Sequence, residues 1–135
     1  MTSELRDLLF TALLTGSLWV PVVIGYVAAR GILRPVDYKV APTKVLPDWV
    51  QRANRAHMNA VESFAPFAAV VLIANACHLS TSTTVASAAA FFWARVAHAV
   101  IHITGFQWLM ARTMIFVVAW GAFVAFSVEL LRQAA

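Results

Sequence analysis

Two long uncharged segments decide what this chain can fold into. Residues 8–29 carry no charged side chain over 22 positions, and residues 63–94 carry none over 32 positions. A helix needs about 20 apolar residues to cross the hydrocarbon core of a bilayer, so the first segment suits one span and the second is too long for one. The stretch 78–84 (HLSTSTT) divides the second segment with turn-forming residues. Both segments therefore predict membrane-spanning helices.

A final apolar stretch completes four predicted spans. The sequence thus predicts an all-α integral membrane four-helix bundle, with residues 1–135 forming a single domain. The composition, 61% hydrophobic and 12% charged, excludes an ordinary soluble domain. We retain the first span as structure, because its apolar run is longer than that of a secretory signal. Pro21 and Pro66 are expected to kink their helices without ending them. The expected helices are 7–30, 50–78, 83–105 and 111–132.

The basic residues predict how the bundle is oriented. The net charge is +4, but the basic side chains are spread along the chain and show no nucleic-acid-binding pattern, so nucleic acid is not an expected partner. Most of them gather in two connections, which the positive-inside rule places in the cytoplasm, with both termini on the opposite side. These residues are Arg30, Arg34, Lys39, Lys44 and Arg52 between the first two helices, and Arg112 after the third.

Two polar stripes lie within the apolar segments. Residues 55–62 (RAHMNAVE) and 95–102 (RVAHAVIH) each place polar side chains on one helix face. A charge at bilayer depth costs about 2.5–3.5 kcal/mol even on insertion scales, so such residues indicate a site. The stripes consist of Arg55, Asn59 and Glu62 on the second helix, and of Arg95, His98 and His102 on the third.

The charges of the stripes predict an anion site. Glu62 and Arg95 fall at similar depth and have opposite signs, so we expect them to form an ion pair. That pair alone would fix helix register, which is the structural alternative to a site. Arg55 and Arg112 leave positive charge in excess on the cytoplasmic side, and this excess should attract an anion.

We expect neither a metal site nor a functional cysteine in this chain. His98 and His102, four residues apart, could bind a metal ion together with Glu62, but Arg95 one turn away would oppose a cation. No metal ligand is therefore assigned. Cys77 is the single cysteine and permits no internal disulfide bond.

The order of these motifs resembles a known family. Arg-Ala-His-x-Asn-x-x-Glu at 55–62, Pro66 four residues later, Arg-Val-Ala-His at 95–98 and a basic residue opening the fourth helix are similar to the membrane-associated proteins in eicosanoid and glutathione metabolism (MAPEG). That family includes microsomal glutathione transferases and prostaglandin E synthase. The resemblance implies a homotrimer among membrane lipids, here in a bacterial inner membrane. It also implies glutathione as co-substrate, bound between neighbouring protomers near the cytoplasmic face, and transfer to a lipophilic electrophile.

The resemblance also implies roles for individual residues. Arg112 matches the arginine held near the thiol and is the expected catalytic residue. One departure is His102, which stands where the family enzymes commonly have tyrosine. The expected glutathione-binding residues are Arg30, Arg55, Asn59, Glu62, Arg95, His98, His102 and Thr113.

Other functions stay open from the sequence. The same family contains a member that presents lipids to an enzyme without catalysis, so a ligand-binding membrane scaffold is the main alternative to a transferase. Transfer accompanied by peroxidase activity is a second. A small transporter is a third, although no internal repeat is evident.

Overall fold

The chain folds into long helices joined by short connections. The computed structural model describes residues 1–32, 34–39, 45–106 and 110–134. Lys44, one of the basic residues counted above, lies outside this part of the chain. The helices are α1 (Ser3–Ser17), α2 (Trp19–Arg30), the 3-10 helix η1 (Pro35–Tyr38), α3 (Asp48–Ala76), α4 (Ser82–Thr104) and α5 (Ala111–Ala134).

The four predicted spans are confirmed as helices of membrane-crossing length. Because α1 and α2 are nearly continuous, they make one apolar span, and α3, α4 and α5 make the other three, so the chain is an integral membrane protein. The first helix begins four residues earlier than expected, at Ser3. Thr2 caps it there, since its hydroxyl oxygen accepts a hydrogen bond of 3.3 Å from the Leu5 N–H.

The two prolines act differently on their helices. The first span is interrupted at Leu18, between α1 and α2. Pro21 has no N–H to donate to the Ser17 carbonyl, and its ring opposes that carbonyl, which explains the break. Pro66 lies within the continuous helix α3. There it deprives the Glu62 carbonyl of its usual donor four residues on.

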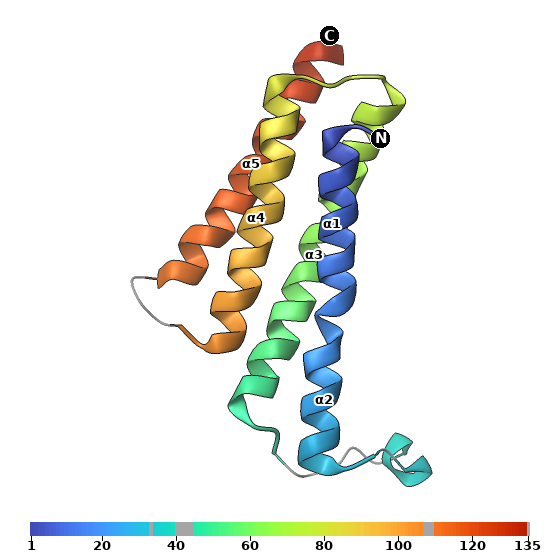
Figure 1. Cartoon of the computed structure of the whole chain (residues 1–135), viewed down its shortest axis with the longest axis vertical. Coiled ribbons are helices and arrows are strands. Elements are labelled where there is room, and N and C mark those ends of the chain that lie inside the picture. The colour runs from blue at the N-terminus through green and yellow to red at the C-terminus, as the bar shows by residue number, and fades with distance from the viewer. Residues whose placement is uncertain (33, 40–44, 107–109, 135) are drawn as a thin grey trace.

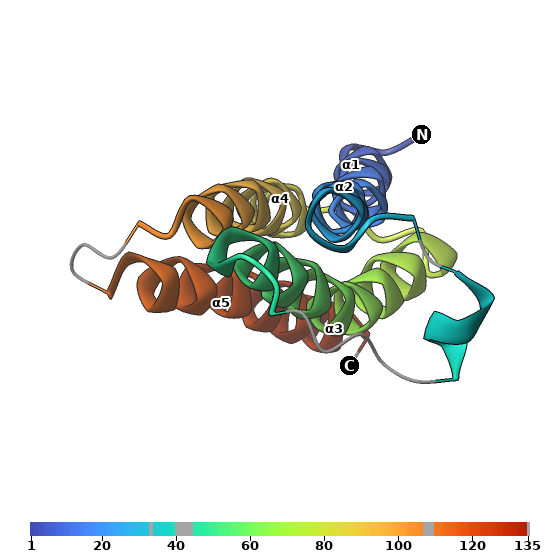
Figure 2. The ribbon, with the colours of Figure 1, turned by 90° about the horizontal axis from the view of Figure 1, so that it is seen from below.

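The helices form an antiparallel bundle. Helix α1 begins and α5 ends at one end of the molecule, called here the terminal end, and the α2–α3 connection lies at the other, the connection end (Figure 1). Seen along the bundle, α4 lies beside α1 and α2 in one row, and α3 lies beside α5 in the other (Figure 2). Helix α4 ends and α5 begins short of the connection end, and α2 and α3 extend past that level towards it (Figure 1).

The apolar core fills the half of the bundle nearer the terminal end. Phe67 of α3 stacks on Phe91 of α4 with ring centroids 3.8 Å apart, and Phe126 of α5 meets Phe67 edge-on at 6.4 Å. Aromatic pairs of this kind add to the free energy gained by burial alone. Nearer the connection end, small residues such as Ala60 and Ala99 line the contact between α3 and α4. The large apolar side chains thus pack the half of the bundle nearer the terminal end, and the polar residues of the two stripes lie in the half nearer the connection end.

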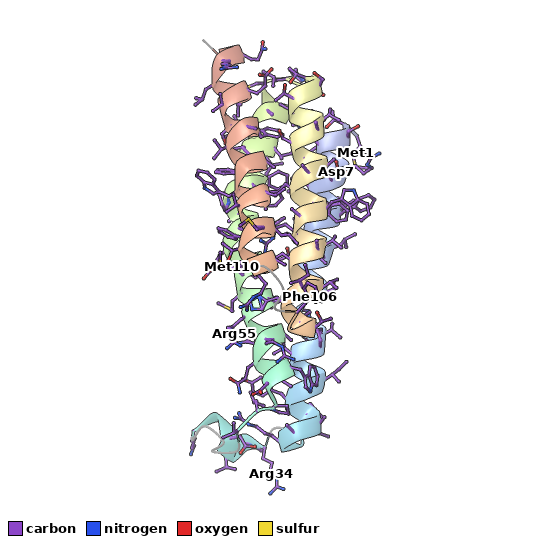
Figure 3. All side chains as sticks on the ribbon, turned by 90° about the vertical axis from the view of Figure 1, so that its left-hand side faces the viewer. Met1, Asp7, Arg34, Arg55, Phe106 and Met110 are labelled. Carbon is purple, nitrogen blue, oxygen red and sulfur yellow. The ribbon has the colours of Figure 1, made fainter. Side chains whose placement is uncertain are left out.

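A carboxylate joins α1 to the start of α4 at the terminal end. Glu4 and Asp7 are both buried there. One Glu4 oxygen, Oε1, accepts hydrogen bonds of 2.7 Å from the Ser80 and Thr84 hydroxyl groups. Asp7, labelled in Figure 3, has one oxygen 3.4 Å from the Arg6 guanidinium. Hydrogen bonds to a charged group are stronger than those between neutral groups, so Glu4 fixes the position of α1 against α4.

Candidate functional site

The centre of the polar region is a hydrogen bond between α3 and α4. Arg95 Nη2 donates to Asn59 Oδ1 at 2.8 Å, and Arg95 is only 3% exposed. The expected ion pair of Glu62 with Arg95 is therefore wrong: in the part of the chain that the structure describes, no ion pair joins them. The reason is geometric. Asn59, one turn from Glu62, meets the guanidinium directly, while the Glu62 side chain is exposed beside it.

Glu62 and Arg95 nevertheless share a cavity, called here the core cavity. Its volume is about 330 Å³ and it lies among α3, α4 and α5. One part is polar and the other aromatic, which suits a ligand that has a charged portion and an apolar portion. The lining residues are Asn59, Glu62, Ser63, Pro66, Phe91, Arg95, Phe116, Ala119, Trp120 and Phe123.

Arg55 and Arg30 lie in a second cavity, called here the α2–α3 cavity. Arg55 is one turn nearer the connection end than Asn59, at a level where α2 faces α3. The Arg30 guanidinium lies over the Tyr26 ring, 5.2 Å from its centroid. The cavity has a volume of about 420 Å³ and is lined by Tyr26, Arg30, Val45, Leu46, Gln51, Asn54 and Arg55.

Arg112 and Thr113 lie in a third cavity at the start of α5, called here the α5 cavity. Its volume is about 340 Å³, and Phe106, Met110 and Ala111 complete its lining. Figure 3 shows Phe106 and Met110 close together where α4 and α5 end and begin, with Arg55 on α3 slightly nearer the connection end. Met110 adopts a left-handed φ of 52°, an uncommon conformation for this residue type.

Two histidines lie one turn apart on α4. The His98 and His102 rings lie edge-on with centroids 5.4 Å apart, and His98 also meets the Phe116 ring at 6.5 Å. His98 is buried, and its Nδ1 has no hydrogen-bond partner among the described residues. The same holds there for both ring nitrogens of His102 and for Arg95 Nη1. Buried polar atoms without protein partners are expected where a polar ligand binds.

Positive charge concentrates around His102. Four arginines from three helices lie within electrostatic range of it, namely Arg52, Arg55, Arg95 and Arg112. Within residues 1–32, 34–39, 45–106 and 110–134, no group of three His, Cys, Asp or Glu side chains could hold a metal ion. The four arginines around His102 suit an anion.

The structure thus brings some predicted site residues together and separates others. Asn59, Glu62 and Arg95 share one cavity, whereas Arg30 and Arg55 line a second cavity and Arg112 and Thr113 a third. Sequence reasoning missed Tyr26 and Arg52. Their spacing gave a signal, since Arg30 follows Tyr26, and Arg55 follows Arg52, by one helical turn.

These features define a polytopic α-helical membrane protein with a polar region inside its bundle. The sequence model of the MAPEG family matches residues 8–132, and the chain belongs to that family. The resemblance noted from the motifs is therefore confirmed. A search of the curated proteins finds no match to the chain.

Proposed function

We propose that this protein is a glutathione transferase that acts on lipophilic electrophiles within the membrane. The observation that carries the proposal is the core cavity, in which Arg95, Asn59 and Glu62 form a polar part next to an aromatic part. A tripeptide thiol fits the polar part, and an apolar electrophile dissolved in lipid fits the aromatic part.

The charges of glutathione match those of the site. Glutathione has two carboxylates and one ammonium group, so it needs cations at two points and an anion at one. Arginine binds carboxylate with two parallel N–H donors. Glu62 offers its carboxylate to the ammonium group, and its carbonyl, freed by Pro66, lies on the same turn. Arg55, Arg95 and Arg30 supply cations, and the unpartnered nitrogens of His98 and His102 supply further polar contacts.

The distribution of these residues supports a homotrimer with a shared site. Glu62 lies at the midpoint of α3 and is exposed in the protomer, so a lone protomer would set a carboxylate against lipid. A neighbouring protomer that covers Glu62 removes this cost. It also allows the arginines of the α2–α3 and α5 cavities to reach one bound tripeptide from two chains. Native mass measurement in mild detergent tests the trimer, and a stable monomer that binds glutathione would refute the shared site.

Arg112 has the catalytic role in this proposal. A free thiol has a pKa of about 8.5, and a neighbouring guanidinium lowers it by favouring the thiolate. Arg112 holds the sulfur as its anion, and the Thr113 hydroxyl group donates to it. The thiolate then attacks an electrophilic carbon: with an aryl chloride, the C–S bond forms, the C–Cl bond breaks and chloride leaves, while the thiol proton has passed to water.

The membrane orientation follows from the same arrangement. The α2–α3 and α4–α5 connections, which carry the excess of arginine, face the cytoplasm of a bacterium, where glutathione is made, and the protein resides in the inner membrane.

One observation favours a second function, a ligand-binding scaffold without catalysis. Arg112 lies in a different cavity from Glu62 and Arg95 within the protomer. If the trimer does not bring Arg112 to the sulfur, glutathione would bind while its thiol stays protonated.

A titration of purified protein with glutathione separates the two functions. For a transferase, thiolate absorbance at about 240 nm grows as the site fills at neutral pH. S-methylglutathione is the control, because it keeps the charges and cannot ionise at sulfur. Binding without thiolate absorbance and without conjugation of a lipophilic aryl chloride would favour the scaffold, and no binding would refute both.

A further inference from the structure

Arg52 ties the last turn of α4 to α3. Its Nε–H donates to the Ile103 carbonyl at 3.2 Å, across 51 positions of sequence. The last four carbonyls of a helix have no partner within it, and a cation near them also interacts favourably with the helix dipole. Arg52 thus satisfies one of these carbonyls from a neighbouring helix.

Gly105 leaves room for the Arg52 side chain at the end of α4. It ends α4 in the left-handed conformation, with φ of 76°, and its N–H and that of Phe106 both donate to the Ile101 carbonyl. A Cβ atom at Gly105 would lie 2.9 Å from Arg52 Nε, closer than Cβ atoms normally approach another atom, and 3.0 Å from Cζ. Glycine therefore suits both the left-handed turn and the close approach of the Arg52 guanidinium.

The Arg52 contact and the Asn59–Arg95 hydrogen bond join α3 to α4 at two levels. They are seven residues apart on α3 and eight apart on α4, which is about 10–12 Å on both helices. His98 and His102 lie between the two levels, and the connection to α5 starts just beyond Ile103. The hydrogen bond of Arg52 therefore fixes the position of His102 relative to α3.

We propose that Arg52 is a positioning residue for the ligand site. By holding the Ile103 carbonyl through Nε, it fixes the final turn of α4, and through that turn the place of His102 and the start of the segment that leads to Arg112. Its role in ligand binding rests on the proposed glutathione site. Its role in holding α4 does not.

The bonding atom gives a sharp test. Arg52 donates with Nε, which is four bonds from Cα, and glutamine has its amide nitrogen at the same distance. Arg52→Gln thus keeps the donor and removes the charge, whereas Arg52→Met keeps similar length and removes both. If the charge of Arg52 were what mattered, the two variants would behave alike.

Hydrogen exchange at the end of α4 measures directly how much the Arg52 hydrogen bond stabilises that turn. We expect amides of Thr104, Gly105 and Phe106 to exchange about fivefold faster in Arg52→Met than in wild type, from loss of one hydrogen bond, and at nearly the wild-type rate in Arg52→Gln. Equal rates in both variants, fast or slow, would overturn the proposal. Should Arg52→Met not fold, Arg52→Leu, which likewise has no donor, takes its place in the comparison with Arg52→Gln.

Glutathione affinity then tests the positioning role. Both variants lack the positive charge and only Arg52→Met lacks the donor, so we expect the Kd to be about fivefold higher in Arg52→Met than in Arg52→Gln. An equal loss of affinity in the two variants would be an effect of charge alone and would overturn the positioning role. Unchanged affinity in Arg52→Met with faster exchange would overturn the positioning role. Absence of glutathione binding in wild type would instead refute the proposed function, and the exchange result would still decide whether Arg52 holds α4.

Discussion

Asn59 and Arg95 form the polar link at the middle of the bundle, with Arg95 Nη2 donating to Asn59 Oδ1 at 2.8 Å. The acceptor is a neutral amide, so this link leaves the positive charge of Arg95 uncompensated. Burying such a charge without a counter-charge is unfavourable. A carboxylate of the ligand would supply that charge, which gives the site a physical reason to bind an anion.

Asn59→Ala should reduce both stability and binding. It removes the hydrogen bond to a buried cation, and losses of this kind cost about 1.5–3 kcal/mol. Reversible unfolding in detergent by a denaturant measures the change. Met58→Ala is the matched control, since Met58 is the neighbouring residue and is 50% exposed. An equal loss in both variants would contradict the role given to Asn59.

Glu62→Gln should leave the stability of the ligand-free protein nearly unchanged, because Glu62 forms no ion pair with Arg95 among the described residues. Its effect should fall on glutathione, whose ammonium group would lose its counter-charge, with Kd raised about tenfold for a loss near 1.4 kcal/mol. Calorimetric titration measures the affinity. A loss of stability as large as that of Asn59→Ala would instead show that Glu62 stabilises Arg95.

Thr84→Val should weaken the contact between α1 and α4. The Thr84 hydroxyl group is fully buried, donates to Glu4 Oε1 at 2.7 Å and accepts a hydrogen bond of 2.9 Å from the Thr81 N–H. Valine has nearly the same shape without the hydroxyl group. We expect a loss of about 1.5–3 kcal/mol in unfolding free energy. Thr83→Val is the control, because Thr83 is the adjacent residue and is exposed. Similar stability of the two variants would show that the Glu4 contact contributes little.

The spans and the family could be predicted from sequence because they depend on local properties. The length of an apolar run fixes a span, and the spacing of residues 55–62 fixes a helix face. The partner of Arg95 could not be predicted, because Asn59 and Glu62 lie on the same face and differ by less than one turn. The burial of Glu4 could not be predicted either, because its partner Thr84 lies 80 positions away and only the fold brings the two together.

The orientation of the protein is tested by fusing a reporter after the last residue of the chain. Helices α1 and α5 begin and end at the same side (Figure 1). The arginines near the α2–α3 and α4–α5 connections predict that this side faces away from the cytoplasm. A reporter that is active only outside the cytoplasm should therefore be active at the C-terminus. Activity of a cytoplasm-specific reporter there would show that the charge bias does not set the topology.

Arg112→Ala separates binding from chemistry. Arg112 is exposed at the start of α5, beside Thr113, and lines a different cavity from Asn59 and Glu62. If its guanidinium meets the sulfur in the assembled site, its loss should abolish the thiolate absorbance at about 240 nm. Conjugation of an aryl chloride should fall at least a hundredfold, since an activated nucleophile is lost. Glutathione affinity should persist, because other residues hold the carboxylates and the ammonium group.

Arg34→Ala is the matched control for Arg112→Ala. Arg34 is also an exposed arginine near the connection end, and it lines none of the three cavities described here. It should keep both the absorbance and the conjugation. Loss of affinity in Arg112→Ala in proportion to the loss of turnover would show that Arg112 binds glutathione without ionising it. Retention of the thiolate signal would assign ionisation to another cation near His102, of which Arg95 is the most buried.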